Sequence, residues 1–254
     1  MTKAYIIAEC GIEHLGQIKL AEQLIDAAKF AGADCVKFQL YSVETARKVD
    51  NGDGPLTKYR LDRAAMQGLW NYSKDAGIDF LLSAFDMDSL KSCKDMGLTA
   101  VKIPSVCNEN MDMIDYAVDN FCEVFISCGL IDDDTELKVI PVRAGVKKLL
   151  CTSAYPCPFD AVNLSAGRFG ERYSGLSDHT IGVTVSIMAV ALGAQIIEKH
   201  FTLERKTGGP DCICSLEPGE FMNLVGSIRD AEAALGTGVK KVMECEKPLL
   251  WRKK

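Results

Sequence analysis

Short apolar runs alternate with longer segments of helical periodicity along most of the chain. The runs contain four to seven residues, are rich in β-branched and aromatic side chains, and predict strands that are buried on both faces. They occupy residues 4–9, 34–40, 79–83, 100–103, 123–127, 147–152, 173–177 and 195–201. Buried strands joined by helices predict a parallel sheet, and eight such units favour closure into one (β/α)8 (TIM) barrel over an open sheet.

Helical spacing is clearest in two of the connecting segments. Residues 20–28 place apolar side chains at i, i+4, i+5 and i+8 before Gly32, and residues 221–235 show the same kind of period before Gly236. One connection differs, because residues 41–55 end in Asn-Gly-Asp-Gly-Pro and predict a long irregular loop. This loop follows the second strand on the ligand-binding side of the barrel, where long loops usually cover the substrate.

The composition fits a single barrel domain over residues 1–254. The chain has 254 residues and 48% apolar side chains, a typical size for this fold. Its formal charge of -6 and pI near 5.2 argue against a general nucleic-acid or anionic-membrane surface, so an anionic ligand must be met by a few local lysines. Residues 180–197 carry no charge, but glycine, threonine, serine and glutamine interrupt them, and we do not expect a membrane span.

The 11 cysteines are scattered, and none forms a Cys-x-x-Cys pair. They predict reduced thiols that pack as small apolar residues, rather than a structural zinc site or a disulfide framework. The sequence Met-Thr-Lys-Ala leads directly into the first strand, so no signal peptide is expected. Together these features predict a cytoplasmic protein.

Two of the three histidines close apolar runs in matching contexts. His179 lies in Ser-Asp-His-Thr and His200 lies in Glu-Lys-His-Phe. Residues at the carboxyl ends of barrel strands point into one shared mouth, so these imidazoles can hold one metal ion, with water or substrate completing its shell. The alternative is that each histidine is a hydrogen-bonded part of the barrel without a metal.

Polar and ionisable residues gather at the other strand ends as well. The predicted ring contains Glu9, Lys37, Gln39, Ser83, Lys102, Ser105, Ser127, Thr152, Ser153, Tyr155, Ser177, His179, Lys199 and His200. Lysines and hydroxyls in the mouth of an acidic protein predict an anionic, phosphorylated ligand. The alternative is that Lys37 and Lys102 are solvated cations, but a lysine within Val-Lys-Phe is costly to bury without a partner. Glu9 is a candidate acid or base, a substrate ligand, or the partner of one lysine.

Several motifs carry a specific resemblance. They are Ile-Ile-Ala-Glu-Cys-Gly at residues 6–11, Val-Lys-Phe-Gln at 36–39, Cys-Thr-Ser-Ala-Tyr-Pro at 151–156, Ser-Asp-His-Thr at 177–180, Glu-Lys-His-Phe-Thr at 198–202 and Gly-Pro-Asp at 209–211. In order and spacing, over nearly the whole chain, they resemble the N-acetylneuraminate (sialic acid) synthases. The resemblance implies a (β/α)8 barrel that condenses phosphoenolpyruvate with an N-acetylated hexosamine, typically N-acetylmannosamine.

The resemblance also implies roles for individual residues. His179 and His200 become ligands of a divalent metal ion, with manganese expected and magnesium or cobalt as alternatives. Glu9 becomes the catalytic residue that manages the added water or its proton. The phosphoenolpyruvate-binding positions are Lys37, Ser83, Lys102, Ser105, Ser127, Ser153 and Ser177. The sugar-binding positions are Gln39, Tyr155 and Asp211.

Some positions depart from the usual family pattern. Glu13 stands where the family usually has asparagine, Ser83 where it has threonine, Cys107 where it has glutamate, and Ser153 where some members have asparagine. The changes at Glu13 and Cys107 alter local charge, and we expect them to bear on the choice of sugar.

The family normally continues past Glu-Lys-Pro at residues 246–248 into a small antifreeze-like domain, whereas this sequence ends at Lys254. We therefore expect a barrel alone, whose site is completed by a homodimer partner, by a separate lid-supplying subunit, or by its own loops. Two other functions stay open. One is the same chemistry on a legionaminic or pseudaminic acid precursor, and the other is a non-catalytic barrel subunit that only binds ligands.

Overall fold

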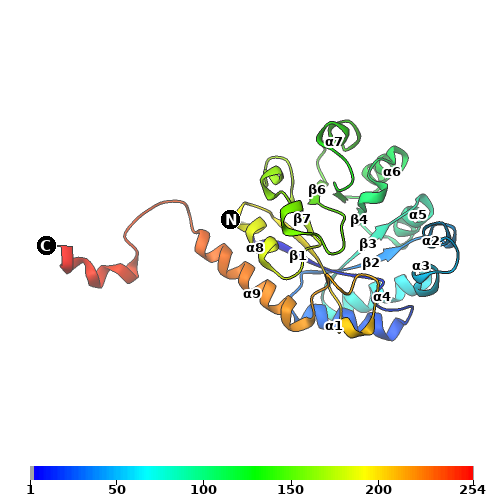
Figure 1. The fold of residues 1–254 in the computed structure, drawn as a ribbon, viewed down its shortest axis with the longest axis horizontal. Coiled ribbons are helices and arrows are strands. Elements are labelled where there is room, and N and C mark those ends of the chain that lie inside the picture. Colours follow the sequence, from blue (N-terminus) through cyan, green and yellow to red (C-terminus); the bar gives the residue numbers. More distant parts are fainter. Residues whose placement is uncertain (1–2, 254) are drawn as a thin grey trace.

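Eight parallel strands close into a barrel in sequential order in this computed structural model, which describes residues 3–253 (Figure 1). The strands are β1 (Tyr5–Gly11), β2 (Cys35–Leu40), β3 (Asp79–Ala84), β4 (Ala100–Ile103), β5 (Glu123–Ser127), β6 (Val146–Cys151), β7 (Gly175–Asp178) and β8 (Ile196–His200). Each lies within two residues of a predicted run, so the predicted (β/α)8 barrel is confirmed.

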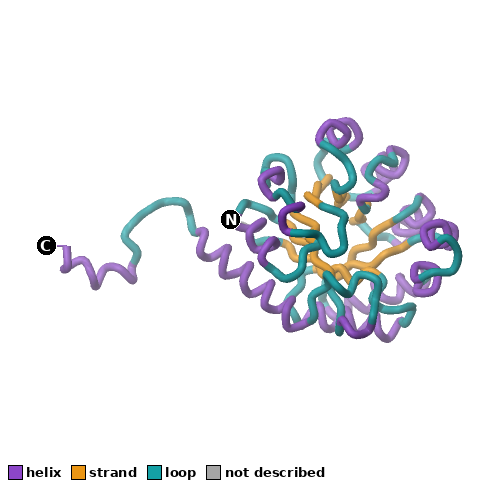
Figure 2. Tube along the Cα trace, viewed as in Figure 1, coloured by secondary structure: helices purple, strands orange, loops and turns teal. Residues whose placement is uncertain are grey.

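Helices surround the strands, as the tube in Figure 2 shows. The α-helices are α1 (Ile18–Phe30), α2 (Val43–Asp50), α3 (Pro55–Tyr59), α4 (Arg63–Ala76), α5 (Met87–Met96), α6 (Met111–Asn120), α7 (Asp133–Val139), α8 (Thr184–Ala191) and α9 (Pro218–Leu235). Asp62, Asp86 and Asp132 cap α4, α5 and α7, because each carboxylate accepts a backbone N–H of the first helical turn.

The period-two alternation of the strands creates two cores. Outward side chains such as Ile6 and Ala8 pack against the helices in the main apolar cluster. Inward side chains at the amino-terminal end of the barrel form a second cluster, which contains Ile7, Cys35, Leu81, Phe125, Leu149 and Ile196. This apolar layer fills the barrel beneath the polar residues that follow two positions later on the same strands.

Two connections differ from the expected alternation. Residues 41–55 were predicted to be irregular, but α2 occupies most of them. Ser42 caps α2 by accepting the N–H of Thr45, and Asn51 ends it in the left-handed conformation (φ 53°). The prediction was wrong because α2 has only eight residues and the Asn-Gly-Asp-Gly-Pro run that follows it indicated a loop for the whole connection. Between β6 and β7, only the short 3-10 turns η2 (Phe159–Ala161) and η3 (Leu164–Gly167) occur.

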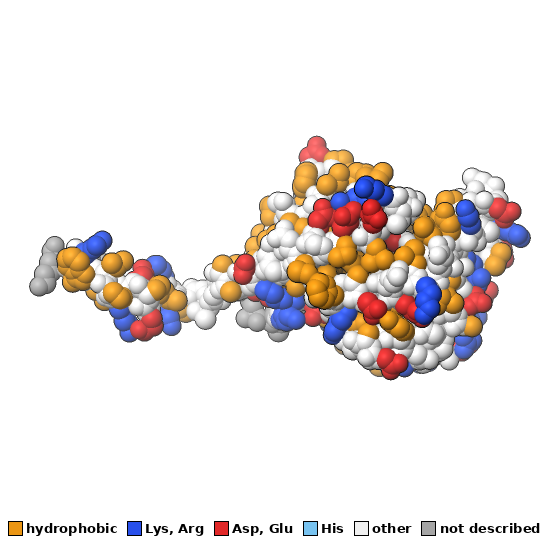
Figure 3. All heavy atoms as spheres, turned by 90° about the horizontal axis from the view of Figure 1, so that it is seen from below, with side chains coloured by type: hydrophobic (Ala, Val, Ile, Leu, Met, Phe, Trp, Pro, Cys, Tyr) orange, Lys and Arg blue, Asp and Glu red, His pale blue; other side chains and the backbone are white. Residues whose placement is uncertain are grey.

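The carboxyl-terminal segment leads away from the barrel. After α9, the chain continues to the 3-10 segment η5 (Glu244–Lys253), which lies apart from the barrel in Figure 1. On the face of the molecule that Figure 3 shows, basic and acidic side chains are interspersed, without a large area of one sign. Within residues 3–253, no helix is both long and apolar enough to cross a membrane, and segment 180–197 instead contains α8 and the start of β8.

Candidate active site

A cavity opens at the carboxyl ends of the strands. Its walls contain all thirteen predicted site residues, which are Glu9, Lys37, Gln39, Ser83, Lys102, Ser105, Ser127, Ser153, Tyr155, Ser177, His179, His200 and Asp211. Phe85, Pro104, Val106, Leu130, Cys151 and Glu198 complete the lining. The structure therefore brings the predicted residues together, while their individual roles stay predictions.

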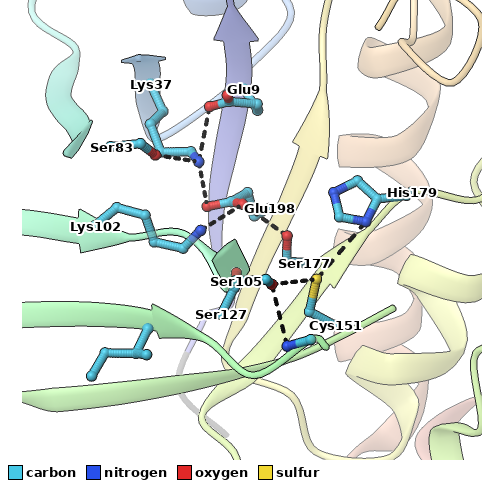
Figure 4. Close-up of polar contacts among 12 residues, drawn as sticks. Glu9, Lys37, Ser83, Lys102, Ser105, Ser127, Cys151, Ser177, His179 and Glu198 are labelled. Atoms are coloured by element: carbon cyan, nitrogen blue, oxygen red, sulfur yellow. Dashed lines mark hydrogen bonds and ion pairs between the residues drawn. The ribbon is translucent and has the colours of Figure 1, made fainter. Parts of the chain in front are cut away.

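An ionic network lies at the centre of the cavity (Figure 4). Lys37 Nζ lies 3.0 Å from Glu9 Oε2 and 3.1 Å from Glu198 Oε2, and it donates to Ser83 Oγ at 3.0 Å. Gln39 Nε2 donates to the other oxygen of Glu9 at 3.0 Å. Lys37 thus joins two carboxylates and a hydroxyl, and Glu9 is held in one orientation between Lys37 and Gln39.

Glu198 joins the two lysines and was missed by the sequence analysis. Its Oε1 lies 3.3 Å from Lys102 Nζ and accepts the hydroxyl of Ser177 at 2.8 Å. Burial opposes its ionisation, but Lys102 and Lys37 more than offset this and hold the pKa of Glu198 below its usual range. Its position two residues before His200 on the same strand was the available signal, because residues i and i+2 share a face.

The two lysines differ in how well their charge is compensated. Burial disfavours both ammonium groups, but Glu198 and Glu9 together raise the pKa of Lys37 above its usual value. For Lys102, burial lowers the pKa, and attraction to Glu198 only partly offsets this while Lys37 adds repulsion. An anion beside Lys102 would supply the missing negative charge.

Hydroxyl groups extend the site beyond Lys102. Ser105 Oγ accepts the backbone N–H of Gly129 at 3.2 Å and lies 3.5 Å from Cys151 Sγ. Ser127 is only 2% exposed, and its buried Oγ has no hydrogen-bond partner among the described residues. A Cβ at Gly129 would lie 2.5 Å from Ser153 Oγ and 2.8 Å from Ser105 Oγ, so any residue other than glycine would clash with these two hydroxyls. This part of the cavity offers donors to an oxyanion.

The two histidines meet at the mouth of the cavity. Their ring centroids are 5.3 Å apart, and the ring of Tyr155 lies 4.3 Å from His179 and 5.7 Å from His200. His179 Nδ1 lies 2.9 Å from the carbonyl of Thr152, which can only accept, so we assign the proton to Nδ1 and leave Nε2 as a free electron-pair donor. His200 Nδ1 is buried without a hydrogen-bond partner and lies 3.8 Å from Asp211 Oδ2.

These donors fit a divalent transition-metal ion with open coordination positions. Neutral imidazole is a common ligand for such ions, and the partnerless nitrogen of His200 is the kind of buried atom that a ligand or ion satisfies. Among residues 3–253, no three histidine, cysteine, aspartate or glutamate side chains are already grouped as a complete ligand set. The fit is therefore to two protein nitrogens, with substrate or water completing the shell.

Two residues of the predicted ring do not face the cavity. Lys199 points to the outer side of the barrel, where its ammonium lies 3.0 Å from Asp178 Oδ2. Since His200 faces inward, its strand neighbour must face outward, and the prediction for Lys199 was wrong for this reason. Thr152 is also outside the lining and donates its hydroxyl to the carbonyl of Ala161.

Glu13, one of the departures from the family pattern, lies behind the cavity wall. Its Oε1 accepts the backbone N–H of Asp211 at 3.1 Å, and its residue is only 2% exposed. Burial raises the pKa of Glu13 to about 7, and burial together with Glu9 raises the pKa of Asp211 to about 6. Glu13 therefore supports the loop that carries Asp211 without touching the cavity itself.

Comparisons with known proteins agree with this geometry. Residues 24–240 match the NeuB family. An N,N'-diacetyllegionaminic acid synthase of Legionella pneumophila is 34% identical, over 96% of this chain and 77% of the relative. The human N-acetylneuraminate-9-phosphate synthase is 32% identical, over 95% of this chain and 74% of the relative. The N-acetylneuraminic acid synthetase of Leptospira borgpetersenii, solved in complex with citrate, has a TM-score of 0.90 at 29% identity, covering 99% and 92% of the two chains.

Proposed function

Because this chain belongs to the NeuB family, we propose that it condenses phosphoenolpyruvate with an N-acetylated hexosamine to give a sialic-acid-type nonulosonic acid and inorganic phosphate. One observation carries the proposal. A single cavity holds the incompletely compensated Lys102 beside the partnerless hydroxyl of Ser127, and it also holds the paired imidazoles of His179 and His200. The first group suits an anion, and the second suits a metal-bound sugar oxygen.

The proposed reaction forms one carbon–carbon bond. C3 of phosphoenolpyruvate attacks the aldehyde carbon of the open-chain sugar, water adds to the cationic C2, and inorganic phosphate leaves. Lys37 and Lys102 hold and neutralise the carboxylate and phosphate of phosphoenolpyruvate, assisted by the cavity serines. Glu9, held by Lys37 and Gln39, is placed to accept a proton from the added water.

The mouth of the cavity orients the sugar. His179 and His200 are the residues that would hold a divalent ion, manganese in the first place, and a bound ion would polarise the aldehyde oxygen. Asp211 and Gln39 offer polar atoms to sugar hydroxyls, and the ring of Tyr155 covers the two imidazoles. These groups restrict how the acceptor aldehyde approaches C3.

A second acceptor is favoured by the apolar part of the cavity lining. Phe85, Pro104, Val106 and Leu130 contribute apolar side chains to it, and Cys107, outside the lining, stands where the family usually has a glutamate. An apolar wall suits a deoxy carbon better than a hydroxymethyl group, because a buried hydroxyl without a partner is costly. A diamino-trideoxy sugar of the legionaminic type is therefore the alternative acceptor.

The test is phosphate release from phosphoenolpyruvate with Mn²⁺ and a panel of acceptors. The panel contains N-acetylmannosamine, N-acetylglucosamine and a 2,4-diacetamido-2,4,6-trideoxyhexose. We expect sugar-dependent phosphate release with one manno-configured acceptor, and a product whose mass equals sugar plus pyruvate. Reactions without an acceptor, and reactions without protein, are the controls for background hydrolysis. If phosphoenolpyruvate binds but no acceptor releases phosphate, the barrel is a ligand-binding subunit rather than a synthase.

A further inference from the structure

Behind the two histidines, a buried ion pair joins the ends of β7 and β8. Asp178 and Lys199 are register partners on these strands, and the Lys199 ammonium lies 3.0 Å from Asp178 Oδ2. Their side chains are 1% and 0% exposed. Each residue directly precedes one histidine of the candidate metal site, so the pair and the histidines occupy opposite faces of the same two strand ends.

The polar atoms of the pair have several partners in the surrounding elements. Asp178 Oδ1 accepts the backbone N–H and the hydroxyl of Thr180, both at 2.8 Å. Asp178 Oδ2 also accepts the hydroxyl of Ser186, in α8, at 2.6 Å, and Lys199 Nζ donates to the carbonyl of Thr180. The network thus links β7, β8, α8 and the residue that follows His179, and it leaves little freedom to the backbone on either side of that histidine.

Stability alone does not account for this arrangement. Moving both charges out of water is expensive, and buried ion pairs can often be replaced by apolar residues of similar volume without loss of stability. A buried pair can instead specify one geometry among several that are similarly stable. The ion pair adjoins both histidines along the chain, so the geometry that it can specify is the spacing of their two imidazoles, whose centroids are 5.3 Å apart.

We propose that Asp178 and Lys199 are positioning residues that fix the spacing and orientation of His179 and His200 for a shared divalent metal ion. The proposal rests on the metal site of the proposed function. Neither residue lines the cavity, so neither contacts substrate, and their effect passes through the histidine backbones. Partners behind metal-binding histidines typically change metal affinity about 10- to 100-fold when they are lost.

The experiment measures Mn²⁺ affinity of metal-free protein without substrates, from the electron paramagnetic resonance signal of free Mn²⁺. The Asp178→Asn/Lys199→Met double variant removes both charges together and leaves neither one buried alone. We expect about tenfold or weaker Mn²⁺ binding, an unfolding temperature near that of the wild type, and an unchanged KM for phosphoenolpyruvate. Excess Mn²⁺ should restore kcat, which a general packing defect would not allow.

A second buried ion pair, between α7 and β6, provides a control. Glu136 is 2% exposed and contacts Lys148 at 2.8 Å and Arg172 at 3.1 Å, away from the cavity, and Arg172 keeps Asp133 as a partner when Glu136 is replaced. The Glu136→Gln/Lys148→Met variant should retain wild-type Mn²⁺ affinity. If it loses affinity equally, the effect of the first variant is general and the proposal is overturned.

The remaining outcomes are also decisive. A folded Asp178→Asn/Lys199→Met variant with wild-type Mn²⁺ affinity overturns the positioning role and leaves the proposed function intact. If the wild-type protein binds no Mn²⁺, or if His179→Ala binds it equally well, the metal site itself fails and the positioning role fails with it. Should the double variant not fold, Ser186→Ala removes one hydrogen bond to Asp178, and unchanged affinity in that variant overturns the proposal.

Discussion

Lys37 Nζ and Glu198 Oε2 lie 3.1 Å apart inside the barrel, where neither side chain is more than 5% exposed. Lys37 also contacts Glu9, whereas Lys102 contacts Glu198 as its only acidic partner among the described residues. The two lysines therefore have different tasks. Besides its proposed share in anion binding, Lys37 holds two buried carboxylates in place, whereas Lys102 is the lysine whose charge a substrate anion would compensate.

The Lys102→Met variant should lose affinity for phosphoenolpyruvate while staying stable. Glu198 keeps Lys37 and Ser177 as partners, so the substitution leaves no unpaired buried carboxylate. A hydrogen bond to a charged group contributes about 1.5–3 kcal/mol, which corresponds to a KM for phosphoenolpyruvate roughly tenfold or more above that of the wild type. Initial-rate measurements at saturating sugar check this, and an unchanged KM would remove Lys102 from the anion site.

The Lys37→Met variant should instead be destabilised. Removing one partner of a buried ion pair costs about 3–5 kcal/mol, and here both Glu9 and Glu198 lose their contact with Lys37. Urea unfolding of Lys37→Met and Lys102→Met under the same conditions compares the two positions. Equal stability of the two variants would contradict the different tasks assigned to the lysines.

A structure with Mn²⁺ should show His179 and His200 on one ion. Both imidazole nitrogens are expected about 2.0–2.3 Å from the metal. The ion should bind Nε2 of His179, because its Nδ1 faces the carbonyl of Thr152. Metal bound elsewhere, or bound to only one of the two rings, would refute the shared site.

Gly129→Ala should weaken phosphoenolpyruvate binding without unfolding the barrel. The new Cβ would displace the hydroxyls of Ser105 and Ser153, which lie 2.8 Å and 2.5 Å from its position. Losing one hydroxyl contact to a charged oxygen costs about 1.5 kcal/mol, or about tenfold in affinity. Calorimetric titration with phosphoenolpyruvate tests this. The control is Gly68→Ala in α4, where no atom lies within 4 Å of the added Cβ.

Glu13→Gln should change how stability depends on pH. Burial raises the pKa of Glu13 from 4.5 to about 7, so between these values the folded protein binds more protons than the unfolded chain. Stability contributed by this group is therefore present below pH 4.5 and is lost as pH rises to about 7. Glutamine keeps the acceptor for the N–H of Asp211 and removes this loss.

The stability of Glu13→Gln relative to the wild type should thus increase by about 2 kcal/mol between pH 5 and pH 8. Asp211, whose pKa is raised to about 6, titrates in the same range and faces both Glu13 and Glu9. Some pH dependence should therefore persist in the variant. Urea unfolding at several pH values provides the measurement, and parallel curves for the two proteins would show that Glu13 is not the titrating group.

Much of the barrel was predictable because its strands are short, apolar and regularly spaced. Helix α2 was not, since it has only eight residues and runs directly into the Asn-Gly-Asp-Gly-Pro residues that are typical of a loop. The residues that line the site could be predicted from the strand ends and the motifs. The ion pairs among them could not, because Glu198 lies within a strand and its two lysine partners come from β2 and β4. Lys199 was misplaced in the cavity. Adjacent residues of a strand face opposite sides, and Lys199 directly precedes His200, which faces inward.

The apolar layer of Ile7, Leu81 and Phe125 lies beneath the ionic network, and the cavity opens at the carboxyl ends of the strands. Reactants must therefore pass the same opening in sequence. If the proposed function is correct, we expect an anion at Lys37 and Lys102 to arrive before a sugar occupies the region of Asp211 and Tyr155, and to exchange only after that sugar has departed. A compound that occupies only the mouth would block entry of the anion as well as its release, so its inhibition should be mixed with respect to phosphoenolpyruvate.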